Sequence, residues 1–267
     1  MVRRPLGNHH VGPDTLLVTS DTTRTEQVAS ETENDRKPAL DALLAPARVV
    51  LWDFDGPVCR LFAGHSAERV AVGLVEWLEG QGLRGLLTES ERESPDPHAV
   101  LRAVDLRHPG SDLVAELEER LTQEELRAAA SAMPTAWADP LIRTLAAVGR
   151  RLAVTTNNSP RVVTTYLTSR GLTSCFAPHV YGRTRDLHLL KPDPDCLNRA
   201  LRAVGAAPSA ALMIGDTPSD CLAARRAGVP FLGYARNKKK EELLRDAGAT
   251  HVVDSLEPVL AAVRRHA

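Results

Sequence analysis

The stretch Val49-Val50-Leu51-Trp52-Asp53-Phe54-Asp55-Gly56-Pro57-Val58 places an apolar run directly before two carboxylates and a Gly-Pro break. A short apolar run bounded by turn residues predicts a buried strand. Asp53 and Asp55 then lie at the carboxyl end of that strand, where ligands bind in open α/β sheets. Because buried carboxylates are costly and repel each other, a bound divalent cation such as Mg²⁺ is the simplest explanation for the pair. The Asp-x-Asp pattern alone equally fits one Asp that caps a helix beside another in solvent.

The chain has 267 residues, enough for one large domain or two small ones. A hydrophobic content of 43% and a net charge of −1 fit a soluble globular protein and do not indicate a nucleic-acid-binding surface. No stretch approaches the length of a transmembrane helix, and no apolar run typical of a secretory signal follows Arg3 and Arg4. We therefore expect a cytoplasmic protein without membrane or nucleic-acid partners, and the oligomeric state stays open.

The cysteines do not indicate a metal site or a disulfide framework. They lie at Cys59, Cys175, Cys196 and Cys221. None of them forms a Cys-x-x-Cys pair, and the histidines lack the spacing of zinc ligands. Small buried side chains in a reducing compartment are the favoured interpretation.

The chain divides into a tail, a core and an insertion. Residues 1–46 are rich in Thr, Ser, Asp, Glu and Arg, which predicts a disordered tail with a short helical lead-in at 39–44. Residues 47–60 and 137–267 carry the strand patterns and form the predicted core. Residues 61–136 show helical periodicity instead, which predicts an inserted all-helical cap.

Four helices are expected in this insertion. Helix starts are indicated by Ser66, by the Asp96-Pro97 pair and by Ser111, because Ser and Asp cap helices and Pro favours the first turn. The segment Thr122-Gln123-Glu124-Glu125 resembles a capping box. It predicts that a fourth helix begins there and ends before Pro134.

Strand and helix patterns alternate after residue 137. Apolar runs at 152–156, 179–181, 211–214, 231–234 and 251–253 predict five further strands. Residues with helical periodicity lie between them. This alternation predicts an α/β fold, a Rossmann-like parallel sheet with helices on both faces.

Polar residues follow the predicted strands in four motifs: Asp53, Asp55, Thr156, Asn157, Lys191, Asp216 and Asp220. The motifs come in this order, with a helical insertion after the first and a Lys-Pro-Asp-Pro run from Lys191. In these respects the chain resembles the haloacid dehalogenase-like hydrolase superfamily. It is similar to the phosphoglycolate-phosphatase-like branch, whose helical cap lies between the first and second motifs. The resemblance covers Val49 to about Val253.

The resemblance implies a Mg²⁺-dependent phosphatase that hydrolyses a small phosphomonoester. Phosphoryl transfer needs a nucleophile, a proton donor and neutralisation of charge. Asp53 resembles the nucleophile that forms an aspartyl-phosphate. Asp55 resembles the general acid, whose pKa neighbouring negative groups raise. The implied metal ligands are the carboxylates of Asp53 and Asp216 and the backbone carbonyl of Asp55.

The remaining motif residues have implied roles around the phosphate. Thr156 offers its hydroxyl and backbone N–H groups, together with Asn157 and the partial charge of the helix that begins at Ser159-Pro160. Lys191 adds a fixed positive charge that reduces repulsion between the nucleophile and the phosphate. Asp220 supports the metal shell or pairs with the lysine.

Each of these residues also has a structural interpretation. Lys191 taken alone would fit a surface lysine, although the Pro192-Asp193-Pro194 run after it favours the functional role. Thr156 could merely end a strand, Asn157 could be a turn residue, and Asp220 could be an N-cap only. Pro57 departs from the family pattern, because the residue after this glycine usually has an N–H and proline does not.

Cationic residues near and within the predicted cap are candidates to contact an anionic group of the substrate. In chain order they are Arg60, His65, Arg69, Arg102, Arg107 and His108. All six equally fit solvated helix charges. Trp77 and Trp137 fit packing residues better than stacking platforms.

Two other functions are left open beside the phosphatase. A phosphomutase of the same fold would share every motif. A non-catalytic binding protein would be expected to have lost Asp53, Asp55, Lys191 or Asp216, and all four are present. The sequence therefore favours the enzyme, without naming its substrate.

Overall fold

The computed structural model describes residues 38–266. Residues 1–37 and 267 lie outside the described residues, and most of the predicted N-terminal tail lies with them. Residues 38–44 are helical. The buried side chains of Leu40 and Leu44 on this helix pack into an apolar cluster on one face of the sheet.

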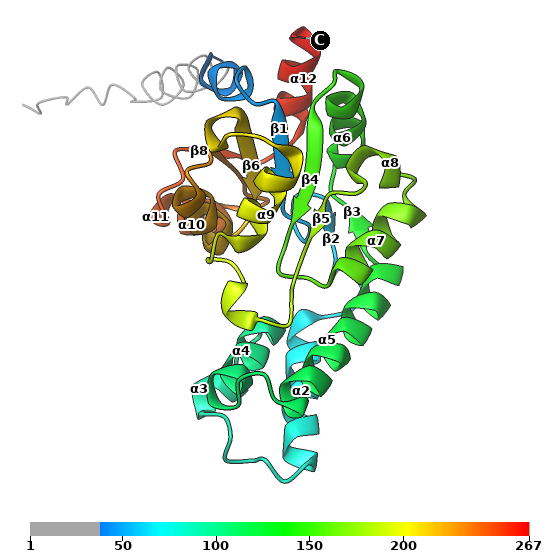
Figure 1. Cartoon of the computed structure of the whole chain (residues 1–267), viewed down its shortest axis with the longest axis vertical. Coiled ribbons are helices and arrows are strands. Elements are labelled where there is room, and N and C mark those ends of the chain that lie inside the picture. Colours follow the sequence, from blue (N-terminus) through cyan, green and yellow to red (C-terminus); the bar gives the residue numbers. More distant parts are fainter. Residues whose placement is uncertain (1–37, 267) are drawn as a thin grey trace, which may run out of the picture. The chain divides into compact units, whose positions relative to one another are not determined.

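A six-stranded parallel sheet forms the core of the fold (Figure 1). β1 (Val49–Trp52) is hydrogen-bonded to β4 (Arg151–Thr155) on one side and to β6 (Ala211–Gly215) on the other. The outer strands are β5 (Val180–Tyr181), β7 (Phe231–Tyr234) and β8 (His251–Val253). The order is β5-β4-β1-β6-β7-β8, and neighbouring strands are parallel. The predicted α/β class is confirmed.

Helices cover both faces of the sheet, so β1 is buried at every position. Val49 and Leu51 pack with α9 and α10. Val50 and Trp52, which point to the opposite face, pack with α6, α7 and α12. The helices of the core are α6 (Ala138–Ala147), α7 (Pro160–Ser169), α8 (Thr173–Phe176), α9 (Asp195–Val204), α10 (Pro218–Ala227), α11 (Lys238–Asp246) and α12 (Glu257–Arg265).

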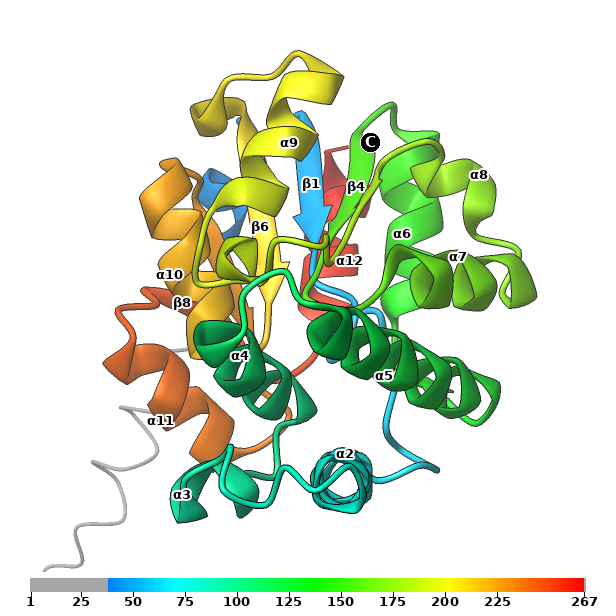
Figure 2. The same cartoon turned by 60° about the horizontal axis from the view of Figure 1, so that its bottom comes forward.

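A group of helices, which we call the helical insert, lies between β2 (Cys59–Arg60) and β3 (Met133–Pro134). Its members are α2 (Ala67–Gly80), α3 (Glu89–Arg92), α4 (Pro97–Arg107) and α5 (Asp112–Ala130). α2, α4 and α5 share an apolar cluster of their own, which Leu187 and Leu190 of the core join. In Figure 2 the insert lies beyond the carboxyl ends of β1 and β6. β2 and β3 pair antiparallel, and the sequence does not indicate them because two-residue strands carry no periodicity.

The predicted fourth helix of the insertion is wrong. α5 is continuous over 19 residues and passes through Thr122 without a break. Leu117, Leu121 and Ala128 lie on one buried face of it, so the apolar spacing favours one helix over two. The Thr122 hydroxyl donates to the Glu118 carboxylate at 3.0 Å instead of capping a new helix.

The helix of the fourth motif begins earlier than its sequence pattern indicates. α10 starts at Pro218, and Thr217 is its N-cap. Asp220 is the third helical residue, and its Oδ2 accepts from the Thr217 N–H at 3.0 Å in a capping box. The N-cap interpretation of Asp220 is therefore wrong.

The two tryptophans differ in their surroundings. Trp77 is half-buried, and the Arg120 guanidinium lies over its ring, 4.4 Å from the centroid. Trp137 is 43% exposed and precedes α6 with a positive φ of 67°. The packing interpretation is wrong for Trp137, because its backbone conformation directs the chain into α6 while the ring stays in solvent.

The cysteines form no disulfide among the described residues. All four cysteines are free thiols, and Cys59, Cys196 and Cys221 are buried. Cys175 is half-buried. Within residues 38–266, no helix has the length and apolar character that crossing a bilayer requires.

Candidate active site

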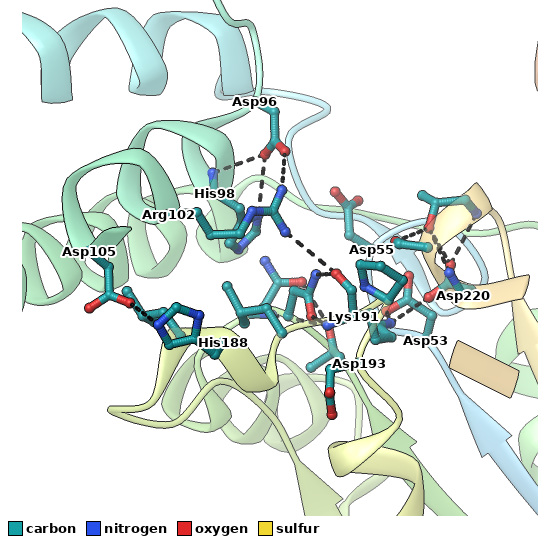
Figure 3. A pocket seen from close by; sticks show the side chains of 18 of the residues that line it. Asp53, Asp55, Asp96, His98, Arg102, Asp105, His188, Lys191, Asp193 and Asp220 are labelled. Atoms are coloured by element: carbon teal, nitrogen blue, oxygen red, sulfur yellow. Dashed lines mark hydrogen bonds and ion pairs between the residues drawn. The ribbon is translucent and has the colours of Figure 1, made fainter. Parts of the chain in front are cut away.

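Carboxylates gather at the edge of the sheet where β1 and β6 end side by side. Asp53 follows β1, Asp216 follows β6, and Asp220 lies in the first turn of α10. All three are buried, and one oxygen of each lies within 4.8 Å of the others. Burial raises the pKa of Asp53 and of Asp216, and the neighbouring carboxylates raise both further. The structure thus brings these three predicted residues together, and Figure 3 shows Asp53 and Asp220 with Lys191 between them.

Lys191 lies against this cluster. Its Nζ donates to Asp53 Oδ1 at 2.7 Å, to Asp220 Oδ1 at 2.5 Å and to the backbone carbonyl of Thr155 at 3.0 Å. Only 2% of the residue is exposed. Burial alone would lower the pKa of Lys191, but the carboxylates of Asp220 and Asp53 outweigh it and raise this pKa. The lysine is a fixed positive charge and not a surface residue.

Asp55 lines the same cavity as Asp53 but makes a separate contact. Its Oδ1 accepts from the backbone N–H of Leu61 at 2.8 Å. Burial raises the pKa of Asp55, so its protonated form persists to a higher pH than for a free aspartate. Gly56 lets the chain turn here: its φ is +125°, and a Cβ on it would lie 2.2 Å from the Asp216 carboxyl carbon.

Thr156 and Asn157 follow β4 and line the cavity. The Thr156 N–H donates to the Tyr181 carbonyl at 3.0 Å, and its hydroxyl donates to Asn158 Oδ1 at 3.0 Å. The Asn157 amide holds the Lys191 backbone, accepting from its N–H at 2.8 Å and donating to its carbonyl at 3.3 Å. The Thr156 side chain therefore shapes the loop, and the Asn157 side chain fixes Lys191.

The N-terminus of α7 is occupied by a side chain of the helical insert. Glu125 Oε2 accepts from the backbone N–H of Ser159 at 3.1 Å, and Oε1 accepts from Asn158 Nδ2 at 3.0 Å. Glu125 therefore already takes one donor of this helix end, the Ser159 N–H, and the contribution of the helix end to phosphate binding stays a prediction. Sequence reasoning missed Glu125, since it treated the residue as part of a capping box.

The cavity measures about 530 Å³ and lies between the core and the helical insert. His98 and Arg102 of α4 line it, opposite Lys191. Arg60 is not among its lining residues: it is exposed on β2, with its guanidinium 3.1 Å from Met133 Sδ. The other cationic candidates, namely His65, Arg69, Arg107 and His108, are also absent from the lining of this cavity.

Lys240 is a further charged residue at the cluster, and sequence reasoning missed it. It lies in the first turn of α11 and forms an ion pair with Asp216 Oδ2. Lys240 is the last of three consecutive lysines, a pattern that on a helix is typical of a solvated face. Only tertiary structure brings it to Asp216, 24 residues away in sequence.

Comparison with known proteins identifies the family. The model of the family described as haloacid dehalogenase-like hydrolase matches residues 15–228. This chain belongs to that family. The resemblance seen in the four motifs is thereby confirmed.

Curated relatives within the haloacid dehalogenase-like hydrolases match part of the chain. Phosphoglycolate phosphatase from Rhodospirillum rubrum is 40% identical over 113 residues, which are 41% of this chain and 45% of that protein. Phosphoglycolate phosphatase from Thiobacillus denitrificans is 37% identical over 105 residues, 38% of this chain and 45% of that protein. A putative pyrophosphatase PpaX from Clostridium perfringens is 27% identical over 127 residues, 48% of this chain and 58% of that protein. The chain spans about half the length of the curated relatives it matches.

Solved structures share the fold over most of the chain. A haloacid dehalogenase-like family hydrolase from Streptococcus pneumoniae has a TM-score of 0.59 at 18% identity, covering 82% of this chain and 99% of that one. CbbY from Rhodobacter sphaeroides, solved with phosphate, has a TM-score of 0.59 at 22% identity, with the same coverage of 82% and 99%. At these identities the likeness concerns the fold.

The carboxylate cluster fits the divalent metal that phosphatases of this family in general use. All three side chains offer oxygen, the ligand that hard cations prefer. Within the described residues, Asp216 Oδ1 is buried without a hydrogen-bond partner, and a cation would satisfy it. Asp53 and Asp216 would hold the ion, and Lys191 flanks it on the side of Asp220.

Divalent cation should stabilise the folded chain. We expect Mg²⁺ or Mn²⁺ at a hundred times its dissociation constant to add about 2.7 kcal/mol to the free energy of unfolding, visible as a higher midpoint of thermal unfolding. Asp216→Asn should abolish this response. Asp105→Asn, a buried carboxylate that lines the cavity away from the cluster, should keep it, and a full response in Asp216→Asn would contradict the metal assignment.

Lys240 should weaken cation binding, because its ammonium competes for Asp216. We expect Lys240→Met to tighten binding of Mg²⁺ roughly tenfold, about 1.4 kcal/mol, in isothermal titration calorimetry. Lys239→Met removes the exposed neighbouring charge and should change the affinity little. Equal or weaker binding in Lys240→Met would show that the lysine does not compete.

Proposed function

We propose that this chain is a Mg²⁺-dependent phosphatase that hydrolyses a small phosphomonoester through an aspartyl-phosphate on Asp53. The observation that carries the proposal is the convergence of Asp53, Asp55 and Lys191 on a single cavity, with Asp216 beside Asp53 in the buried carboxylate cluster. The names of the curated relatives, phosphoglycolate phosphatase and pyrophosphatase, support a phosphate substrate. A small phosphorylated metabolite as partner and a cytoplasmic location stay predictions.

Asp53 is the proposed nucleophile. Its carboxylate attacks phosphorus, the bond to the leaving oxygen breaks, and the phosphoryl group is transferred to the aspartate. Lys191 favours the ionised form of Asp53 against the effect of burial and reduces its repulsion from the incoming phosphate. Asp53, Asp216 and the backbone carbonyl of Asp55 would hold Mg²⁺, which would supply further neutralisation of the phosphate charge.

Asp55 is the proposed general acid and base. Its raised pKa favours the protonated form that gives a proton to the leaving alkoxide. The same carboxylate then takes a proton from the water that hydrolyses the aspartyl-phosphate. The hydrogen bond from Leu61 N–H fixes the orientation of this carboxyl group at the first residue of the insertion.

Thr156 and Asn157 are the proposed phosphate contacts in the loop after β4. The Thr156 N–H is engaged within the sheet, so its hydroxyl makes the contact and exchanges Asn158 Oδ1 for a phosphate oxygen. Asn157 contributes its backbone N–H, since its amide side chain holds Lys191. Asp220 supports the cluster by pairing with Lys191. Arg60 does not enter this proposal, because the cavity does not reach it.

The helical insert is the proposed cap, spanning residues 61–136, over a core of residues 47–60 and 137–267. Its residues His98 and Arg102 face the reacting groups across the cavity. A cavity of about 530 Å³ admits a small substrate.

A phosphomutase of the same fold is the second candidate. It would use the same groups but pass the phosphoryl group from Asp53 back to the substrate instead of to water. Release of inorganic phosphate with turnover separates the two. A non-catalytic binding protein would release none.

Hydrolysis should depend on Asp53 and on the metal. We expect phosphate release from at least one member of a panel of phosphorylated metabolites with Mg²⁺, and none with chelator. Asp53→Asn should lower kcat by about three orders of magnitude or more, as loss of a nucleophile does. The malachite green assay measures the released phosphate. Turnover that persists in Asp53→Asn would exclude the covalent route.

Asp55→Asn should separate proton transfer from metal binding. We expect kcat to fall by about 10²- to 10⁴-fold, the usual contribution of general acid–base catalysis, while calorimetry shows unchanged Mg²⁺ affinity. The backbone carbonyl that contacts the metal is the same in this variant. If Asp55→Asn weakened Mg²⁺ binding as much as Asp216→Asn does, the acid–base role would be wrong.

A further inference from the structure

A buried ion pair joins the helical insert to the core. Glu125 lies on α5, and Arg183 follows β5. Their side chains are fully buried. Arg183 Nη1 donates to Glu125 Oε1 at 2.9 Å and Nη2 donates to Oε2 at 3.2 Å, so the contact is bidentate. Neither residue belongs to the four motifs.

The same two residues hold the loop after β4 from both sides. Glu125 accepts from Asn158 Nδ2 and from the backbone N–H of Ser159. Arg183 Nη1 donates to the Asn157 carbonyl at 3.0 Å, and the Arg183 N–H donates to the Asn158 carbonyl at 3.0 Å. Every one of these contacts involves residues 157–159, directly after Thr156.

This loop leads in turn to the reacting groups. Asn157 makes two hydrogen bonds with the Lys191 backbone, one through each end of its amide. Lys191 Nζ lies 2.7 Å from Asp53 Oδ1. A continuous set of hydrogen bonds therefore runs from a carboxylate of the insert to the lysine that contacts the proposed nucleophile.

The surroundings of the pair keep it ionised. Burial alone would raise the pKa of Glu125, but the Arg183 guanidinium and His98 together outweigh burial and lower this pKa to about 2. Glu118 accepts from Arg183 Nε at 2.8 Å, Thr122 accepts from Nη2 at 2.8 Å, and His98 Nε2 lies 3.3 Å from Glu125 Oε1. Because a buried charge that loses its main partner is strongly unfavourable, removal of either residue should lower stability.

We propose that Glu125 is a positioning residue which, paired with Arg183, sets the loop of residues 156–159 for phosphate binding, so that full activity requires the helical insert to be seated on the core. This inference rests on the proposed phosphatase function. A purely apolar contact between the insert and the core could hold the two together but could not position this loop as the charged pair does.

The test separates positioning from folding. Glu125→Leu removes the bidentate partner of the buried Arg183 and leaves it only the single contact with the half-exposed Glu118 carboxylate, and should lower the midpoint of thermal unfolding. The double variant Glu125→Leu with Arg183→Met removes both charges, and should recover that midpoint because apolar residues of similar volume replace buried ion pairs well. It still lacks the acceptor for Asn158 and Ser159.

We expect the double variant to lose about 10²-fold in kcat, the effect of a misplaced reacting group. Inorganic phosphate should bind about tenfold more weakly by calorimetry, a loss of about 1.4 kcal/mol. Mg²⁺ affinity should stay unchanged, because Asp53 and Asp216 are intact. Recovery of kcat together with the unfolding midpoint would show that the pair only stabilises the fold. A parallel loss of Mg²⁺ affinity would likewise overturn the positioning role.

Matched controls use the same helix and the same pair. Glu119 of α5 makes an exposed ion pair with Arg161 of α7, with side chains 50% and 57% exposed. Glu119→Gln removes the charge from this other link between insert and core and should leave kcat and phosphate affinity unchanged. Equal losses in Glu119→Gln would overturn the proposal.

A second variant is available should the double variant not fold. Arg183→Lys keeps the charge but loses the bidentate contact and the bond to Asn157. Wild-type kcat and phosphate affinity in this variant would overturn the proposal.

Failure of the proposed function gives a different result. If the wild-type chain releases phosphate from no substrate, the phosphatase proposal fails, and the phosphate and Mg²⁺ titrations still decide the positioning role. A wild-type chain that binds no phosphate overturns both.

Discussion

The mutual repulsion of three buried carboxylates at one edge of the sheet is the constraint on which the rest of this structure depends. Asp53, Asp216 and Asp220 lie close together and away from water, an arrangement that is unfavourable without compensating charge. Lys191 compensates from one side and Lys240 from the other. The two lysines come from segments far apart in the chain, so forming the site requires most of the core to be folded. A cation bound here would add positive charge to a carboxylate cluster that the fold of the sheet has already assembled.

The sheet and the carboxylate cluster were predictable because both follow from local patterns and one rule of topology. Each strand is visible as a short apolar run, and parallel strands present their carboxyl ends at the same edge. Asp53 and Asp216 each stand directly after such a run, and their strands are neighbours. Proximity in sequence was a poorer guide. Arg60 lies five residues after Asp55, yet β2 pairs with β3 and leaves its side chain outside the cavity.

The charged residues that sequence reasoning missed lack any local signal. Glu125 and Arg183 are 58 residues apart, and no spacing rule connects a residue of a helix with a residue of a loop at that separation. Lys240 resembles its solvated neighbours Lys238 and Lys239 in every local respect. The sequence does not show which partner each of these charged residues has. The folded structure shows it, because a charge inside a protein must be paired. Asn157 shows the converse: its type and place predicted a contact with substrate, and its amide instead holds the Lys191 backbone.

Because α5 is continuous, the buried pair couples the position of the helical insert to the loop after β4. At 19 residues the helix is about 28 Å long. Its first half contributes Val114, Leu117 and Leu121 to the apolar cluster of the insert, and its last turns contribute Ala128 to the cluster on the sheet. Glu125 lies between the two. A helix that restarted at Thr122, as the capping-box pattern predicted, would place a flexible joint between the insert and Glu125. The unbroken helix instead makes Glu125 move with the insert as one rigid body, so any displacement of the insert acts directly on the loop that holds Lys191.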